Sequence, residues 1–194
     1  LIRQIKIASR YLDGPIQNEI KKVTFKSTEM RAVRENDPIF MKAYRAEHHC
    51  YKMQASSEVT RPVKSVDVFI NPKLIKAFKK QKKQFAKQGI NSNPVYGYHV
   101  TNPSSILSIV GENFDMKFAK RQVHGPGHYF SEFPEVTYQY GSGLIFCELL
   151  TGQEYLGSEM EWKKHGNSKV GPKFSYIYLP TFMSAFLFEI KKII

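Results

Sequence analysis

Three histidines near the middle of the chain are the first side chains whose type could do chemistry. His99 lies in an alternating aromatic segment, and His124 and His128 flank a Gly-Pro-Gly turn. Histidine nitrogens bind zinc and related metals, but no acidic or cysteine residue lies at ligand spacing from these three. The sequence therefore predicts no bound metal. Taken alone, His99 is more typical of a strand histidine that bonds to the main chain.

A run of lysines is the second set of side chains with a chemical use. Seven lysines and no acidic residue lie between Lys73 and Lys87, and their combined positive field could bind phosphate groups. Such a face is also typical of a helix that is simply solvated. The residues that we expect to contact nucleic acid are Lys76, Lys79, Lys80 and Lys83. Because no exposed aromatic residues are interleaved with them, the binding would ignore base sequence and weaken with salt.

Short helices and strands must position these side chains. Proline at the first helical position, after a capping Asp or Asn, predicts three helices. They begin near Asp37-Pro38, Asn71-Pro72 and Asn102-Pro103 and end near His48, Gly89 and Gly111. Apolar alternation predicts strands near 21–26, 65–70, 95–100, 128–130, 144–149, 174–179 and 185–190. With the longer helices first and most strands later, the order favours an α+β fold on antiparallel sheet over a doubly wound fold.

Six segments carry a family resemblance by their order and spacing. They are Asp37 to Phe40, the run from Val66 through Asn71-Pro72, Tyr96 to Thr101, Gly125 to Phe130, Leu144 to Gly152, and Tyr176 to Ile190. Together they resemble the catalytic domain of the poly(ADP-ribose) polymerase family, the diphtheria-toxin-like ADP-ribosyltransferases. The resemblance covers about residues 37 to 191. It implies an α+β fold with a mainly antiparallel split sheet and short helices.

The resemblance also implies a substrate, NAD, and no metal. Breaking the nicotinamide–ribose bond passes through a cationic state, so the protein must hold the nicotinamide and orient the ribose. In that family a histidine bonds the adenosine ribose, and His99 stands in its place. Two tyrosines pack around the nicotinamide, and these would be Tyr129 and Tyr140. The hydroxyl that bonds the carboxamide would come from Thr137.

Two positions depart from the family's pattern. Val100, which is followed by Thr101 in the expected NAD-binding segment, replaces a glycine whose main chain holds the carboxamide, and its Cβ could crowd the ring. Polymer-forming members carry a Glu on the penultimate strand, where this chain has Lys173 or Ser175, depending on the alignment. Since neither residue is acidic, polymer formation is not expected.

Three functions remain open on this basis. The first is a mono-ADP-ribosyltransferase-like domain that modifies a protein or nucleic-acid acceptor, with His99, Tyr129 and either Lys173 or Ser175 at the catalytic positions. The second is a catalytically inactive domain of the same fold that serves as a scaffold or nucleic-acid-binding module. The third is a plain nucleic-acid-binding domain whose resemblance to the family is accidental.

Composition bears on partners and location. The chain has 194 residues and a net charge of +12, more positive charge than a pyrophosphate requires, so we expect a second partner such as nucleic acid or an acidic protein. A hydrophobic share of 42% excludes a disordered chain. We expect one domain over 37–194 with an extension, 1–36, packed on it. Two cysteines, no signal peptide and no membrane-spanning run predict an intracellular protein of the nucleus or cytoplasm. The start at Leu1 predicts further domains in a longer chain.

Overall fold

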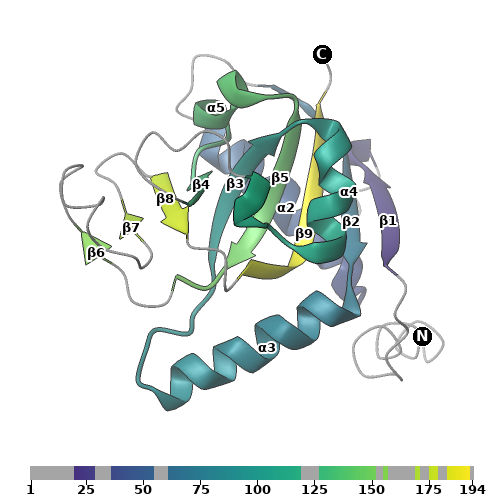
Figure 1. Ribbon diagram of the computed structural model, residues 1–194. Helices are drawn as coiled ribbons and strands as arrows, with labels where there is room; N and C mark the ends of the chain where they lie inside the picture. The colour runs from purple at the N-terminus through teal and green to yellow at the C-terminus, as the bar shows by residue number, and fades with distance from the viewer. Residues whose placement is uncertain are drawn as a thin grey trace.

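The structure is a computed structural model that describes residues 20–28, 36–54, 61–118, 127–151, 155–156, 169–170, 175–178 and 183–192, the last four ranges by their main chain alone. The described chain has the predicted α+β fold (Figure 1). Its helices are α2 (Pro38–Gln54), α3 (Pro72–Lys87), α4 (Pro103–Glu112) and α5 (Pro134–Thr137), with the 3-10 turns η2 (Met116–Phe118) and η3 (Tyr138–Tyr140). Its strands are β1 (Lys21–Lys26), β2 (Val63–Ile70), β3 (Val95–Thr101), β4 (His128–Ser131), β5 (Gly143–Leu149), β6 (Tyr155–Leu156), β7 (Lys169–Val170), β8 (Ser175–Tyr178) and β9 (Met183–Lys192).

These strands form one sheet in the order β1-β2-β9-β5-β3-β4-β8-β7-β6. All neighbours are antiparallel except β6 and β7. β3 lies at the join between two halves of this sheet. It pairs with β5 over seven residue pairs, from Val95 to Thr101, but with β4 only at Tyr98 and Ser131. The sheet is therefore mainly antiparallel, as predicted, and its two halves are joined through a single residue pair.

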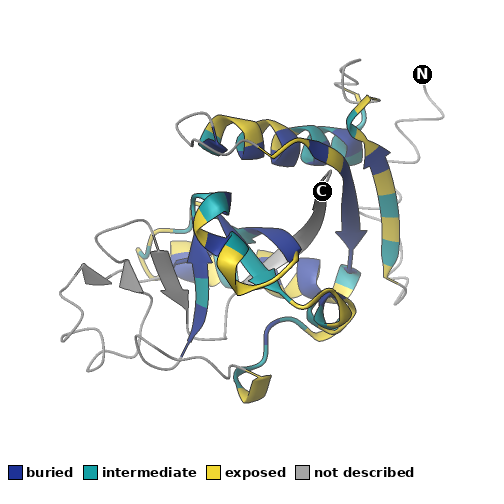
Figure 2. Cartoon of the chain, turned by 90° about the horizontal axis from the view of Figure 1, so that it is seen from above, coloured by how far each residue is buried: buried dark blue, intermediate teal, exposed yellow. Residues whose placement is uncertain are grey.

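Part of the N-terminal extension forms the edge of this sheet. β1 pairs with β2 over six residue pairs, from Lys21 to Lys26. Along β1 exposed residues alternate with partly or fully buried ones, whereas β2 is buried almost throughout (Figure 2). The alternation reflects a strand that covers the core with one face only. Residues 1–19 and 29–35 of the extension lie outside the described residues.

Local capping determines where the helices begin. Asp37 Oδ1 accepts hydrogen bonds from the main-chain N–H groups of Ile39 and Phe40, both at 3.0 Å. Asn71 Oδ1 accepts from the N–H groups of Lys73 at 3.0 Å and of Leu74 at 3.3 Å. Such side-chain acceptors satisfy N–H groups that have no partner within the helix. The predicted starts at Pro38, Pro72 and Pro103 are thus all confirmed.

One predicted helix end was wrong. α2 continues past His48 to Gln54, because its last turns are held by the core: Cys50 and Gln54 are buried and Gln54 Nε2 donates to the Cys50 carbonyl. The end predicted near Gly111 is confirmed to within one residue: α4 ends at Glu112, and Asn113 adopts the positive φ of 73° that turns the chain.

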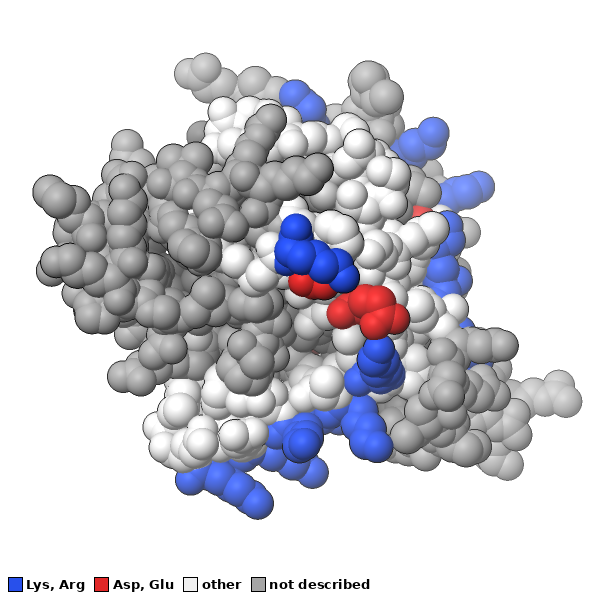
Figure 3. Space-filling view, in the orientation of Figure 1, with Lys and Arg blue, Asp and Glu red and all other residues white. Residues whose placement is uncertain are grey.

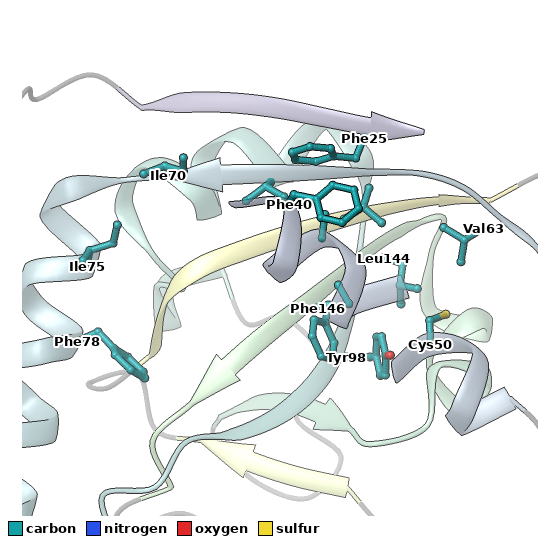
Figure 4. Packing of buried hydrophobic residues seen from close by; sticks show 14 of the residues in the cluster. Phe25, Phe40, Cys50, Val63, Ile70, Ile75, Phe78, Tyr98, Leu144 and Phe146 are labelled. Atoms are coloured by element: carbon teal, nitrogen blue, oxygen red, sulfur yellow. The ribbon is translucent and has the colours of Figure 1, made fainter. Parts of the chain in front are cut away.

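The core has two parts, one on each face of the central strands. On the α2 face, Phe40, Tyr98, Leu144 and Phe146 pack with side chains of β2 and α3 (Figure 4). On the α4 face, the second cluster is centred on buried side chains of α4, the segment after it, β4 and β5: Ile106, Val110, Phe114, Phe130 and Ile145. Because successive strand residues point to opposite faces, β3 contributes to both clusters. No helix in the described part of the chain is long and apolar enough to cross a membrane.

Candidate functional site

The candidate site lies where β3 and β4 part. Tyr98 and Ser131 form the one strand pair between β3 and β4, while Val100 pairs with Leu144 of β5 and Tyr129 with Ile177 of β8. A Cβ placed on Gly141 would lie 2.8 Å from the Thr101 carbonyl oxygen and 3.0 Å from Val100 Cγ1. The turn η3 and Gly141 therefore pack directly against the end of β3. The expected NAD-binding set thus has four members in neighbouring segments: Val100 and Thr101 in β3, Tyr129 in β4 and Tyr140 in η3.

His99 is fixed by a main-chain hydrogen bond. Its Nδ1 lies 2.9 Å from the Tyr129 carbonyl oxygen. A carbonyl only accepts, so Nδ1 carries the hydrogen and the neutral ring presents Nε2 as an acceptor. Burial lowers the pKa of His99 to about 4, against the opposing effect of the Tyr129 carbonyl, and a positive charge on His128 would lower it further. His99 is therefore uncharged at neutral pH, and the described residues provide no hydrogen-bond partner for its Nε2.

The rings of His99 and Tyr129 lie on different faces of the sheet. The His99 ring meets Phe114 edge-on at 4.8 Å and Phe130 at 5.4 Å, on the α4 face. Tyr129 precedes Phe130 on β4, so its side chain points to the opposite face, together with Val100. The structure therefore brings His99 and Tyr129 together through the His99 side chain and the Tyr129 carbonyl, and their rings do not meet.

The remaining NAD-binding candidates, Thr137 and Tyr140, differ in their availability. The hydroxyl of Thr137 is buried and donates to the Pro134 carbonyl at 2.6 Å, within α5. The side chain of Tyr140, three residues later, is 58% exposed. An exposed tyrosine ring offers a flat face to a ligand. Thr137 would have to exchange its bond within α5 before it could bind a carboxamide.

Only one of the two candidates for the position where polymer-forming members carry Glu lies within the described residues. Ser175 begins β8 and pairs with Ser131, level with Tyr98, whereas Ile177 pairs with Tyr129. Lys173 lies outside the described residues. The residues of β8, Ser-Tyr-Ile-Tyr, include no acid. β8, the neighbour of β4, therefore brings no carboxylate to the place where β3 and β4 part.

The structure adds one residue that the sequence interpretation did not include, Gly141. It packs against β3, and the only sequence signal for this was a glycine directly after Tyr140. His128, which the sequence offered only as a possible metal ligand, is buried with 7% exposure, and its Nε2 has no hydrogen-bond partner among the described residues. Burial lowers the pKa of His128, and the charge of Asp115 opposes that shift. Within the described ranges, no three His, Cys, Asp or Glu side chains are arranged to hold a metal.

The lysine candidates all lie on α3. Lys76, Lys79, Lys80 and Lys83 are exposed, on the side of the helix opposite its buried apolar residues. Lys73, at the start of the helix, forms an exposed ion pair of 2.8 Å with Glu112 of α4.

Comparisons with protein-family models and with the curated proteins found no match for the chain.

Proposed function

We propose that this domain binds NAD where β3 and β4 part, and transfers a single ADP-ribose unit to a protein or nucleic-acid acceptor. The observation that carries the proposal is that β3 pairs with β4 at a single residue pair, Tyr98 and Ser131, whereas it pairs with β5 as far as Thr101. Main-chain N–H and C=O groups at the edge of a strand can hold a planar amide. The resemblance to the ADP-ribosyltransferases assigns that task to the same segment.

Three side chains would assist. Nε2 of the neutral His99 ring is an acceptor suited to a ribose hydroxyl, because Nδ1 is already committed to the Tyr129 carbonyl. The exposed ring of Tyr140 would stack on the nicotinamide, whose positive charge favours an aromatic face. Thr101, at the end of β3 beside Gly141, would line the same place.

The chemistry would be a substitution at the ribose carbon. The bond from ribose C1′ to the nicotinamide nitrogen breaks, nicotinamide leaves with the bonding electrons, and a nucleophile of the acceptor bonds to C1′ and loses its proton to water. In β8 neither Ser175 nor the three residues after it can supply a carboxylate to activate a sugar hydroxyl. This supports transfer of one unit and argues against repeated addition to a growing polymer.

Calorimetry with NAD and with benzamide, a mimic of nicotinamide, tests the proposal. We expect both to bind, and the Tyr140→Ala variant to bind at least about fivefold more weakly, since stacking on an aromatic ring contributes about 1 kcal/mol or more. Phe118→Ala is the matched control, because Phe118 is an aromatic residue with similar exposure, 62% against 58%. Absence of binding by both compounds, with no labelled ADP-ribose incorporated, would refute the proposal.

Two features of the same site favour a second candidate function. The Thr137 hydroxyl is already used by the Pro134 carbonyl, and Val100 stands where the family has glycine. Both features suit a catalytically inactive ADP-ribosyltransferase-fold module that acts as a scaffold in a larger protein. Incubation with labelled NAD distinguishes the candidates: the enzyme labels itself or an acceptor, whereas the inactive module binds without any transfer.

We also propose a second, polyanionic partner for the domain, nucleic acid or an acidic protein, on the exposed lysines of α3. The excess of positive charge, 29 Lys and Arg against 17 Asp and Glu, supports such a partner because NAD carries only a pyrophosphate. A protein with these ligands would work in the nucleus or the cytoplasm. Further domains of a longer chain would then direct it to its acceptor.

A further inference from the structure

The exposed side of α3 carries one sign of charge along its whole length. We call this surface the lysine face, and it consists of Lys73, Lys76, Lys79, Lys80, Lys83 and Lys87. Five of its members follow spacings of three and four residues, which place them on one side of an α-helix. Positive side chains line the helix along the lower edge of the molecule (Figure 3). From Lys73 to Lys87 the face is about 21 Å long at 1.5 Å per residue.

The lysine face opposes the formation of its own helix. Like charges three or four residues apart, such as Lys79 and Lys83, destabilise a helix, and α3 contains no acidic residue that could offset them. Among the six lysines of this face, only Lys73 has an acidic partner within the described residues, Glu112. The helix is held instead by its buried apolar side: Leu74, Ile75, Phe78 and Phe85. An external polyanion would relieve this repulsion when it binds.

The other features of α3 narrow the kind of polyanion. The described residues expose no large hydrophobic side chain on this helix, and it contains no arginine. Protein interfaces are enriched in aromatic residues and arginine and depleted in lysine, so this surface does not suit a protein partner. A membrane-bound helix inserts its apolar side, but here that side is packed in the core. A phosphate backbone needs only charge, and the exposed Gln84 and Gln88 add hydrogen-bond donors at the C-terminal end.

We infer that the lysine face binds the phosphate backbone of a nucleic acid without reading its bases. The inference deepens the proposed polyanionic partner and does not depend on NAD binding. A straight helix of this length would contact about four or five phosphates. Since each neutralised phosphate of a duplex contributes about −0.9 to the slope of log K against log salt, a total slope near −4 is expected.

Fluorescence anisotropy with labelled duplexes of two unrelated sequences tests this inference. The expected result is equal affinity for both duplexes, with a slope near −4 between 50 and 200 mM salt. Changing Lys79→Gln together with Lys83→Gln removes two contacts and is expected to reduce the slope by about 2. The matched control is Lys52→Gln with Lys64→Gln, which removes the same charge from exposed positions on α2 and β2 and leaves the slope near −4.

Three outcomes would overturn the inference: no duplex binding, an equal change of slope in both double variants, or binding to poly-glutamate or phosphatidylserine vesicles in preference to the duplex. Far-ultraviolet circular dichroism confirms that both variants keep their helices, so that lost binding is not lost folding. NAD affinity measured on the same proteins keeps the two proposals apart. The Lys79, Lys83 variant is expected to bind NAD as the unchanged domain does, whether or not that binding is detectable.

Discussion

β5 pairs with all seven residues of β3, whereas β4, the other neighbour of β3, pairs with one. On the β5 side the ring of Phe146 stacks on Tyr96 at 5.2 Å and contacts Tyr98 at 5.0 Å. On the β4 side, beyond the single pair, His99 Nδ1 bonds to the Tyr129 carbonyl and the His99 ring contacts Phe130 at 5.4 Å. The strand pairing with β5 thus extends over the whole of β3, whereas the strand pairing with β4 is limited to Tyr98.

The comparison indicates how a sheet can be stable and still present main-chain groups to a ligand. The half of the sheet that contains β5 holds β3 in place, so the end of β3 does not need β4 for its position. In the other half of the sheet, β4 pairs with β8, where Ser131 lies opposite Ser175. This division of the sheet predicts that substitutions on the β5 side unfold the domain, whereas substitutions on the β4 side change mainly the local site.

The largest effect is expected from Phe146→Ala. The side chain is 1% exposed and contacts three rings, the third being His49 at 4.9 Å, so its removal leaves a cavity in the core. Loss of a buried phenylalanine lowers the free energy of unfolding by about 3 to 5 kcal/mol. Urea denaturation followed by tryptophan fluorescence and circular dichroism measures it. Tyr129→Ala on β4, a half-buried aromatic position, is expected to cost no more than about 2 kcal/mol. Equal losses would contradict the comparison.

Much of the β5 side could be predicted from the sequence, because its signals are local. Asn71-Pro72 and Asn102-Pro103 marked the helix starts, and apolar alternation located β3 and β5 to within a residue or two. Helix ends were less predictable. Whether α2 stops near His48 or continues to Gln54 depends on what its last turns pack against, which is not a local property.

The β4 side could not be predicted in the same way. Motif spacing identified His99, Tyr129 and Tyr140, but the face on which each ring lies depends on the register between strands about thirty residues apart. The spacing likewise could not reveal that Gly141 touches β3, since that contact is long-range. Nor could it reveal that the Thr137 hydroxyl is committed to the Pro134 carbonyl. Motif spacing therefore suffices to propose a set of candidate residues but not to predict how they are arranged.

The next largest effect is a pH dependence that arises from His99. Its pKa is about 4 when folded, owing to burial, and near 6.5 when unfolded. Between these values the unfolded chain binds a proton that the folded domain does not, so stability is full above pH 6.5 and falls as the pH drops toward 4. The slope from this group is at most about 1.4 kcal/mol per pH unit, or about 3 kcal/mol in total between the two pKa values.

His99→Gln isolates this contribution, because glutamine can donate to the Tyr129 carbonyl but does not titrate in this range. Chemical denaturation of both proteins at several pH values between 4 and 7.5 measures the difference. Burial also lowers the pKa values of His49 and His128, so the variant keeps a residual slope of the same sign. Identical pH profiles for the two proteins would show that His99 is protonated alike in both states and is not held as described.

The smallest change in stability is expected from Gly141→Ala, and it is the most specific to the β4 side. The added methyl group would lie 2.8 Å from the Thr101 carbonyl oxygen, too close for a carbon, so η3 must move away from β3. Overpacking of this kind costs about 1 kcal/mol at an exposed position such as Gly141. Because Tyr140 precedes the glycine, we expect NAD affinity to fall by more than stability does.

The control is Gly111→Ala in α4, whose methyl group meets only Ile20 at 3.7 Å and is expected to stabilise the domain by about 0.5 to 1 kcal/mol. Thermal unfolding and NAD calorimetry on both variants test this, and unchanged NAD affinity in Gly141→Ala would separate η3 from the site and restrict the site to β3 and β4 themselves.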